Sequence, residues 1–111
     1  MVNPSIAYPI STCGNTNKLL PDMAASGAKI IDLDWMVDLG RAVEIFGDRV
    51  CPCGNFDPVQ VMLRGTPATV RDAVLNCLDQ GGDYLFSGAG CEIPDSTPPE
   101  NLLAHYQTLC R

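Results

Sequence analysis

The sequence predicts an α/β fold in which four strands alternate with helices and lie parallel in one sheet. Four short apolar runs are each followed by a polar loop and then by a segment whose apolar residues recur at helical spacing. Strands that alternate with helices in this way are joined by right-handed crossovers, and they therefore run parallel. The 111 residues, 46% of them hydrophobic, are enough for a single domain that covers residues 1–111.

The first two strand-helix units occupy the first half of the chain. Residues 6–12 form the first strand-like run, and a segment of helical character follows and ends at Gly27. Its helix either starts near Leu20 or keeps Pro21 in its first turn, where no N–H is needed. Residues 29–33 form the second run. The helix that follows ends at Gly47, because glycine readily adopts the left-handed conformation that terminates helices. Its apolar face consists of Leu39, Ala42, Val43 and Phe46.

The third unit contains two helix-start signals. After the strand-like run 49–53, Asp57 caps a short helix that begins at Pro58 and ends at Gly65. Thr66-Pro67 then repeats the signal and begins a longer helix with one apolar stripe. The stripe consists of Val70, Ala73, Val74, Cys77 and Leu78.

The fourth unit begins with the strand-like run 84–87. Thr97-Pro98-Pro99-Glu100 has the form of a capping box with a proline at the first helical position, so a helix is expected to begin there. The residues expected on its buried face are Leu102, Leu103, Tyr106, Leu109 and Cys110.

Composition excludes several classes of protein. The formal net charge is -6 and Lys and Arg form no cluster, so neither nucleic acid nor a membrane surface is an expected partner. No run of about 18 apolar residues could span a bilayer, and no signal-like segment is visible, so a cytoplasmic protein is expected. Its six cysteines are therefore expected to be reduced thiols or metal ligands.

Polar and small residues gather where the predicted strands end. Because the carboxyl ends of parallel strands meet at one edge, this is where α/β proteins bind their ligands. Turn geometry and helix caps account for Asn15, Asp57 and Thr97, but they do not account for the cysteines. The residues at the strand ends are Ser11, Cys13, Asn15, Asp34, Cys53, Asn55, Asp57, Ser87, Cys91 and Glu92.

Four motifs, taken in order and spacing, carry a resemblance to a known family. They are Cys13-Gly14-Asn15-Thr16, Asp32-Leu33-Asp34-Trp35, Gly54-Asn55-Phe56-Asp57-Pro58, and Gly90-Cys91-Glu92-Ile93-Pro94 with Thr97-Pro98. From about Ile6 onward the chain resembles the later half of uroporphyrinogen decarboxylase-like proteins. The resemblance implies that the four units form the carboxyl-terminal half of a TIM (β/α)8 barrel.

The cysteines favour one branch of that family. Cys13 and Cys91 resemble the zinc site of the methylcobalamin:coenzyme M methyltransferases. This resemblance implies that zinc activates a substrate thiol, which takes a methyl group from methylcobalamin or from a methylated corrinoid protein. The branch binds zinc through a His-x-Cys pair and a distant cysteine, whereas Ser11 stands at the histidine position here, and serine is a poor zinc ligand.

A third metal ligand is therefore needed, because catalytic zinc usually has three protein ligands. Cys53, at the end of the neighbouring strand, and Glu92, next to Cys91, are the candidates. Asp34 and Glu92 are also the candidate catalytic carboxylates, since a strand-end acid in a pocket can hold a substrate group or shift its protonation. The alternative for Asp34 is a solvated acid in a turn.

The remaining cysteines and the one histidine have simpler interpretations. Cys13 and Cys91 could instead be buried small hydrophobes, and this is the preferred interpretation for Cys77 and Cys110. Alternation places Cys51 and Cys53 on the same face of their strand. His105 is expected to be a surface or packing residue rather than the missing metal ligand.

Half a barrel has two unpaired edges and a face with no opposite wall, so association is expected. The partner is either another copy, as in a homodimer, or a separately encoded amino-terminal half. An open three-layer sandwich is the alternative architecture. The alternative function is a non-catalytic half-barrel or assembly module. Tetrapyrrole decarboxylation ranks lower, because in relatives it depends mainly on residues from the amino-terminal half.

Overall fold

The computed structural model describes residues 9–110 and contains one sheet of four parallel strands. The strands follow one another across the sheet in the order β1-β2-β3-β4, as predicted. Residues 6–8 of the first predicted strand lie outside the described residues. The strands are β1 (Pro9–Ser11), β2 (Ile30–Asp32), β3 (Cys51–Phe56) and β4 (Phe86–Ala89).

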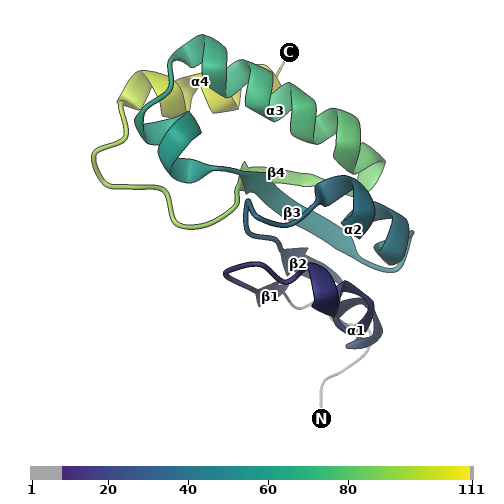
Figure 1. The fold of residues 1–111 in the computed structure, drawn as a ribbon. Coiled ribbons are helices and arrows are strands. Elements are labelled where there is room, and N and C mark those ends of the chain that lie inside the picture. Colours follow the sequence, from purple (N-terminus) through teal and green to yellow (C-terminus); the bar gives the residue numbers. More distant parts are fainter. Residues whose placement is uncertain (1–8, 111) are drawn as a thin grey trace.

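The helices pack side by side in chain order along one face of this sheet (Figure 1). An open sandwich would carry helices on both faces, so that alternative is wrong and the arrangement is that of a partial barrel. The helices are α1 (Leu20–Ala25), α2 (Leu39–Phe46), α3 (Pro67–Gly81) and α4 (Pro99–Leu109). Shorter helical segments are η1 (Asn17–Leu19), η2 (Pro58–Leu63) and η3 (Gly82–Tyr84).

Side-chain caps determine where several helices begin. The Asp57 carboxylate accepts hydrogen bonds from the backbone N–H groups of Val59 and Gln60, and the Thr66 hydroxyl accepts one from that of Thr69, as predicted. The prediction of a capping box at Thr97 is wrong. Helix α4 begins one residue later than a box would require, with Pro98 at its cap position and no side-chain cap. The Thr97 hydroxyl is buried without a partner among the described residues.

The core lies between the helices and one face of the sheet. On β2, Ile31 is buried beneath the helices, as is Leu33 just after it, whereas Ile30 and Asp32 on the opposite face are partly exposed. Within residues 9–110 that opposite face carries no helix, and Phe86 of β4 is 51% exposed there. The largest fully buried side chains are Phe46, Leu20, Ile31, Leu33, Met62, Val50, Val70, Val74 and Asn101.

The buried face of α4 differs from the prediction. Asn101, Ala104 and Thr108 are buried, and the Asn101 amide donates hydrogen bonds to the carbonyl groups of Met62 and Gly65. The predicted residues do share a face of the helix, but nothing among the described residues covers it. The exposed residues are Leu102, Leu103, Tyr106, Leu109 and Cys110.

Across residues 9–110 no helix combines the length and the apolar character needed to cross a bilayer.

Candidate metal centre

Three side chains from three loops converge beyond the carboxyl ends of the strands. Cys13 follows β1, Asp34 follows β2 and Cys91 follows β4, and one donor atom of each lies within 4.8 Å of the other two. The Sγ atoms of Cys13 and Cys91 are 3.8 Å apart, although β1 and β4 are the two outer strands of the sheet. The predicted meeting of these two cysteines is confirmed.

The Asp34 carboxylate holds two of these loops together. Its Oδ2 accepts a hydrogen bond from the Gly14 N–H at 2.6 Å, and its Oδ1 accepts one from the Trp35 N–H at 2.7 Å. Asp34 is only 4% exposed, so it is not a solvated turn acid. Because Gly14 directly follows Cys13, this hydrogen bond fixes the first cysteine beside the carboxylate.

Gly90 brings the third loop into place. Its N–H donates to the Phe56 carbonyl at 2.8 Å, and a Cβ added to Gly90 would lie 2.8 Å from the Trp35 Cα and 2.9 Å from the Asp34 carbonyl carbon. Two backbones approach this closely only where a side chain is missing. The Asn55 amide braces the turn beneath by donating to the carbonyls of Asp34 and Val37. Cys91 is therefore held against Asp34 by backbone packing.

The electrostatics of the cluster favour a bound cation. The pKa of the Cys13 thiol is raised, first by its hydrogen bond to Cys91, then by the Cys91 charge, desolvation and the Asp34 charge. Two thiolates and a carboxylate repel one another, so a nearby cation favours their joint ionisation. Cys13 and Cys91 are both exposed, so the alternative that they are buried hydrophobes is wrong.

The donor set fits zinc. Thiolate and carboxylate are both zinc ligands, and catalytic zinc usually takes three protein ligands with one position left for substrate. Two thiolates on one tetrahedral zinc are ~3.8 Å apart, given a Zn–S bond of ~2.3 Å. The Cys13 and Cys91 sulfur atoms have this separation.

The two candidates for the third ligand lie elsewhere. Cys53 is on the face of the sheet without helices, where desolvation and then the hydrogen bond to Asp32 and its charge raise the pKa of its thiol to about 12. Glu92 is exposed, and neither residue belongs to the group of three donors. A metal role for either stays a prediction, and so does a catalytic role for Glu92. The side chain of Ser11 lies outside the described residues.

His105 and Cys77 are packing residues, as predicted. The His105 Nε2 lies 3.1 Å from the Ser87 Oγ, and its ring meets Phe56 edge-on at 5.6 Å between centroids. Burial lowers the pKa of His105. Cys77 is buried and its thiol donates to the Asn55 side-chain oxygen, whereas Cys110 is exposed, so the prediction that Cys110 is buried is wrong. Cys51 and Cys53 are both partly exposed and flank the buried Pro52, as alternation predicts.

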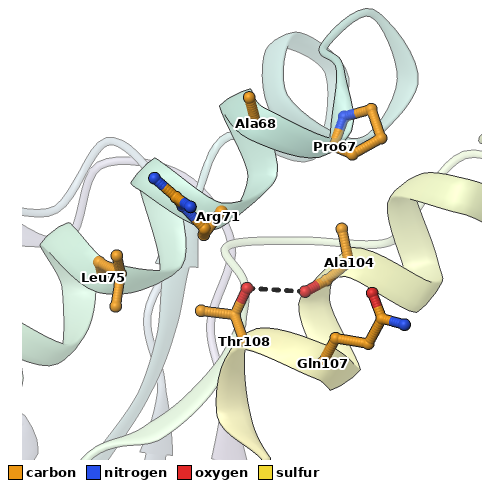
Figure 2. Close-up of a pocket in the computed structure, with 7 residues that line it drawn as sticks. All are labelled: Pro67, Ala68, Arg71, Leu75, Ala104, Gln107 and Thr108. Atoms are coloured by element: carbon orange, nitrogen blue, oxygen red, sulfur yellow. Dashed lines mark hydrogen bonds between the residues drawn. The ribbon is translucent and has the colours of Figure 1, made fainter. Parts of the chain in front are cut away.

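A groove on the outer surface is separate from this cluster. It has a volume of 710 Å³ and lies between α3 and α4 (Figure 2). Its walls contain no residue of the metal cluster. The residues that line it are Pro67, Ala68, Arg71, Leu75, Ala104, Gln107 and Thr108.

Fold and site together define a partial parallel α/β barrel with a thiol-rich cluster beyond its strand ends. The family described as "Uroporphyrinogen decarboxylase (URO-D)" matches residues 2–109. The chain therefore belongs to the uroporphyrinogen decarboxylase family, as the four motifs predicted.

Relatives of two kinds are similar to this chain. A uroporphyrinogen decarboxylase of Chlorobium phaeovibrioides is 40% identical over 91 residues, which cover 78% of this chain and 25% of the relative. A methylcobamide:CoM methyltransferase of Methanosarcina mazei is 36% identical over 97 residues, which cover 87% of this chain and 28% of the relative. The chain thus spans about a quarter of the length of the curated relatives it matches.

A solved structure shares the fold. A methyltransferase from Methanosarcina mazei superposes with a TM-score of 0.81 at 27% identity, over 92% of this chain and 30% of that chain. Both the partial-barrel architecture and the family are therefore shown by independent comparisons.

Proposed function

We propose that this chain supplies the metal-binding, thiol-activating part of a corrinoid-dependent methyltransferase. The convergence of Cys13, Asp34 and Cys91, with the two sulfur atoms 3.8 Å apart, carries the proposal. Relatives named methylcobamide:CoM methyltransferase and methylated-thiol--coenzyme M methyltransferase support the choice of reaction. Decarboxylases are also among the relatives, but two exposed thiols beside a buried carboxylate suit a thiophilic metal.

In this proposal each residue of the cluster has one task. Cys13 and Cys91 bind zinc as thiolates and release their protons when they do so. Asp34 is the third donor, and its hydrogen bonds from Gly14 and Trp35 orient the carboxylate. When bound here, zinc supplies Lewis acidity that keeps a substrate thiol in its thiolate form, ready to accept a methyl group from a methylated corrinoid.

Metal analysis tests the site directly. Protein purified without chelator and offered zinc is expected to hold it stoichiometrically, and Cys13→Ser and Cys91→Ser are expected to lose it. Asp34→Asn is expected to weaken zinc binding by more than the roughly 10–100-fold typical of losing a residue that supports a ligand, because here the carboxylate donor itself is lost. Cys110→Ser is the matched control, since Cys110 is also an exposed cysteine but lies outside the cluster.

A fifth variant tests whether the third ligand is Asp34 or Cys53. Cys53→Ser is expected to keep its zinc, because the Cys53 thiol bonds to Asp32 and stays protonated near neutral pH. Absence of zinc from the unmodified chain contradicts the proposed site. Loss of zinc from Cys53→Ser while Asp34→Asn retains it contradicts the ligand assignment.

We also propose that further β/α units cover the exposed end of the sheet. Three exposed apolar features border the outer strand β4: the apolar face of α4, Tyr84 just before the strand, and Phe86 on the sheet face opposite the helices. The relatives are about four times as long as the matched region, so they contain additional chain that could complete a barrel. A corrinoid protein is the second proposed partner, as the methyl donor. The alternative is a non-catalytic module whose only task is assembly.

The association is tested by mixing the chain with the portion of the Methanosarcina mazei methyltransferase that this chain does not match. Light scattering after size exclusion is expected to detect a one-to-one complex that Leu103→Glu disrupts, because Leu103 belongs to the apolar face and is 53% exposed. Gln107→Glu adds a charge to the same helix outside that face and serves as the control. A complex of two identical chains supports the homodimer instead, and a well-folded monomer in every mixture contradicts both forms of association.

A further inference from the structure

Two exposed thiols meet although they are far apart in the sequence. Cys13 and Cys91 are separated by 78 positions, and their Sγ atoms lie 3.8 Å apart. Both side chains are exposed, and both are free cysteines. A disulfide bond needs the sulfur atoms to approach to about 2.05 Å. The two thiols are within hydrogen-bonding distance of each other, so a displacement of less than about 2 Å would bring their sulfur atoms to bonding distance.

The backbone imposes this proximity. The residue after Cys13 is tied to the Asp34 carboxylate by its N–H, and the residue before Cys91 packs directly on the backbone of Trp35. Both cysteines are thus positioned by one turn, residues 34–35, rather than by the rotation of free side chains. Groups held together in this way react as if each faced the other at a high effective concentration.

We propose that Cys13 and Cys91 form an intramolecular disulfide when the protein meets a small-molecule disulfide. One cysteine attacks the oxidant as its thiolate, forms a mixed disulfide and displaces the first small thiol. The other cysteine then attacks the protein sulfur of that mixed disulfide and displaces the second small thiol. The two protein thiols are oxidised, the oxidant is reduced to two thiols, and the two protons leave with them.

Oxidation and metal binding then exclude each other. Sulfur atoms joined in a disulfide are no longer thiolates, so neither can serve as a zinc ligand. The disulfide itself follows from the geometry alone, whereas its effect on the metal rests on the proposed function. Oxidation of the Cys13–Cys91 pair would therefore prevent metal binding, and its reduction would restore the two metal ligands.

Oxidised glutathione, added to the chelator-treated chain, tests the bond. Thiol titration under denaturing conditions is expected to fall by two from six. The mass is expected to fall by about two daltons with the loss of two hydrogen atoms. Peptide mapping is expected to join the segment containing Cys13 to the segment containing Cys91. Cys110→Ser removes the third exposed cysteine and is expected to give the same crosslink.

Single variants provide the matched comparison. Cys13→Ser and Cys91→Ser are each expected to stop at the mixed disulfide and to carry one glutathione at the remaining cysteine. Stable glutathione on both cysteines of the unmodified chain, or a crosslink to any other cysteine, overturns the proposal. Prior loading with zinc is expected to protect both thiols. A crosslink that forms equally fast with zinc present leaves the disulfide standing and contradicts the metal site.

Discussion

Replacement of Gly90 by alanine tests whether backbone packing assembles the metal centre. The added Cβ would lie 2.8 Å from the Trp35 Cα and 2.9 Å from the Asp34 carbonyl carbon. The Trp35 backbone nitrogen would lie closer still. Carbon atoms in contact are ordinarily about 3.5–4.0 Å apart, so the loop must retreat by roughly 1 Å or more. The obstructing atoms belong to the backbone, and rotation of a side chain cannot relieve the overlap.

The retreat separates Cys91 from its two partners. Overpacking of this kind costs about 1–3 kcal/mol of folding stability. Displacement of a metal ligand through the residues that support it typically weakens metal binding by about 10–100-fold. We therefore expect Gly90→Ala to bind zinc more weakly by that factor and to form the Cys13–Cys91 disulfide more slowly than the unmodified chain.

Gly88→Ala is the matched control, two residues earlier in β4. A Cβ at Gly88 would meet only the Cys53 Sγ, at an ordinary contact distance of 3.7 Å, so its zinc affinity is expected to stay unchanged. Zinc affinity is measured by competition with a chromophoric chelator, and stability by urea unfolding without metal. Equal affinities and equal unfolding midpoints for Gly90→Ala and the unmodified chain would refute the reasoning.

Two further predictions concern the contacts that hold α4. Burial lowers the pKa of His105 in the folded chain, so the unfolded chain binds the proton more readily. The free energy of unfolding is therefore expected to fall as the pH falls below about 6.5, the ordinary histidine pKa. In His105→Gln, the urea midpoint is expected to change less with pH between about pH 5 and 7. An equally steep change in the variant argues against this. Asn101→Ala leaves the buried carbonyl of Met62 and the partly buried carbonyl of Gly65 without their donor. It is expected to cost about 1–3 kcal/mol in thermal unfolding, whereas Gln107→Ala at an exposed position should cost little.

The strand-helix alternation could be predicted because it depends on local information. Apolar spacing correctly identifies the buried face of α2, where Leu39, Ala42 and Phe46 lie in the core. The same spacing fails for α4, although it groups the apolar residues on one face correctly. Periodicity indicates which residues share a face, but it does not indicate what covers that face. Here Asn101 and Ala104 face the neighbouring elements, and the leucines face outward.

The third donor of the metal cluster depends on the register of the sheet. Ser11, Asp32, Cys53 and Phe86 are paired across the four strands and form one row. Cys13 and Asp34 each lie two residues beyond that row, which is ~6.6 Å further along a strand direction. Cys53 lies in the row itself, two residues before the level of Cys13. A ligand set that contains both cysteines would therefore combine residues from two different levels along the strands.

The residue of β3 at the level of Cys13 and Asp34 is Asn55, two positions after Cys53. Its amide does not join the donors but fastens the Asp34 turn from below. Register is a property of strand pairing, which no single segment of the sequence contains. Had the row been known, counting two residues onward from each strand would have selected Asp34 as the acid beside Cys13. The register also explains how a carboxylate can be the third donor in a chain that has serine at position 11. Asp34 follows β2, the strand next to β1, and lies at the same level as Cys13.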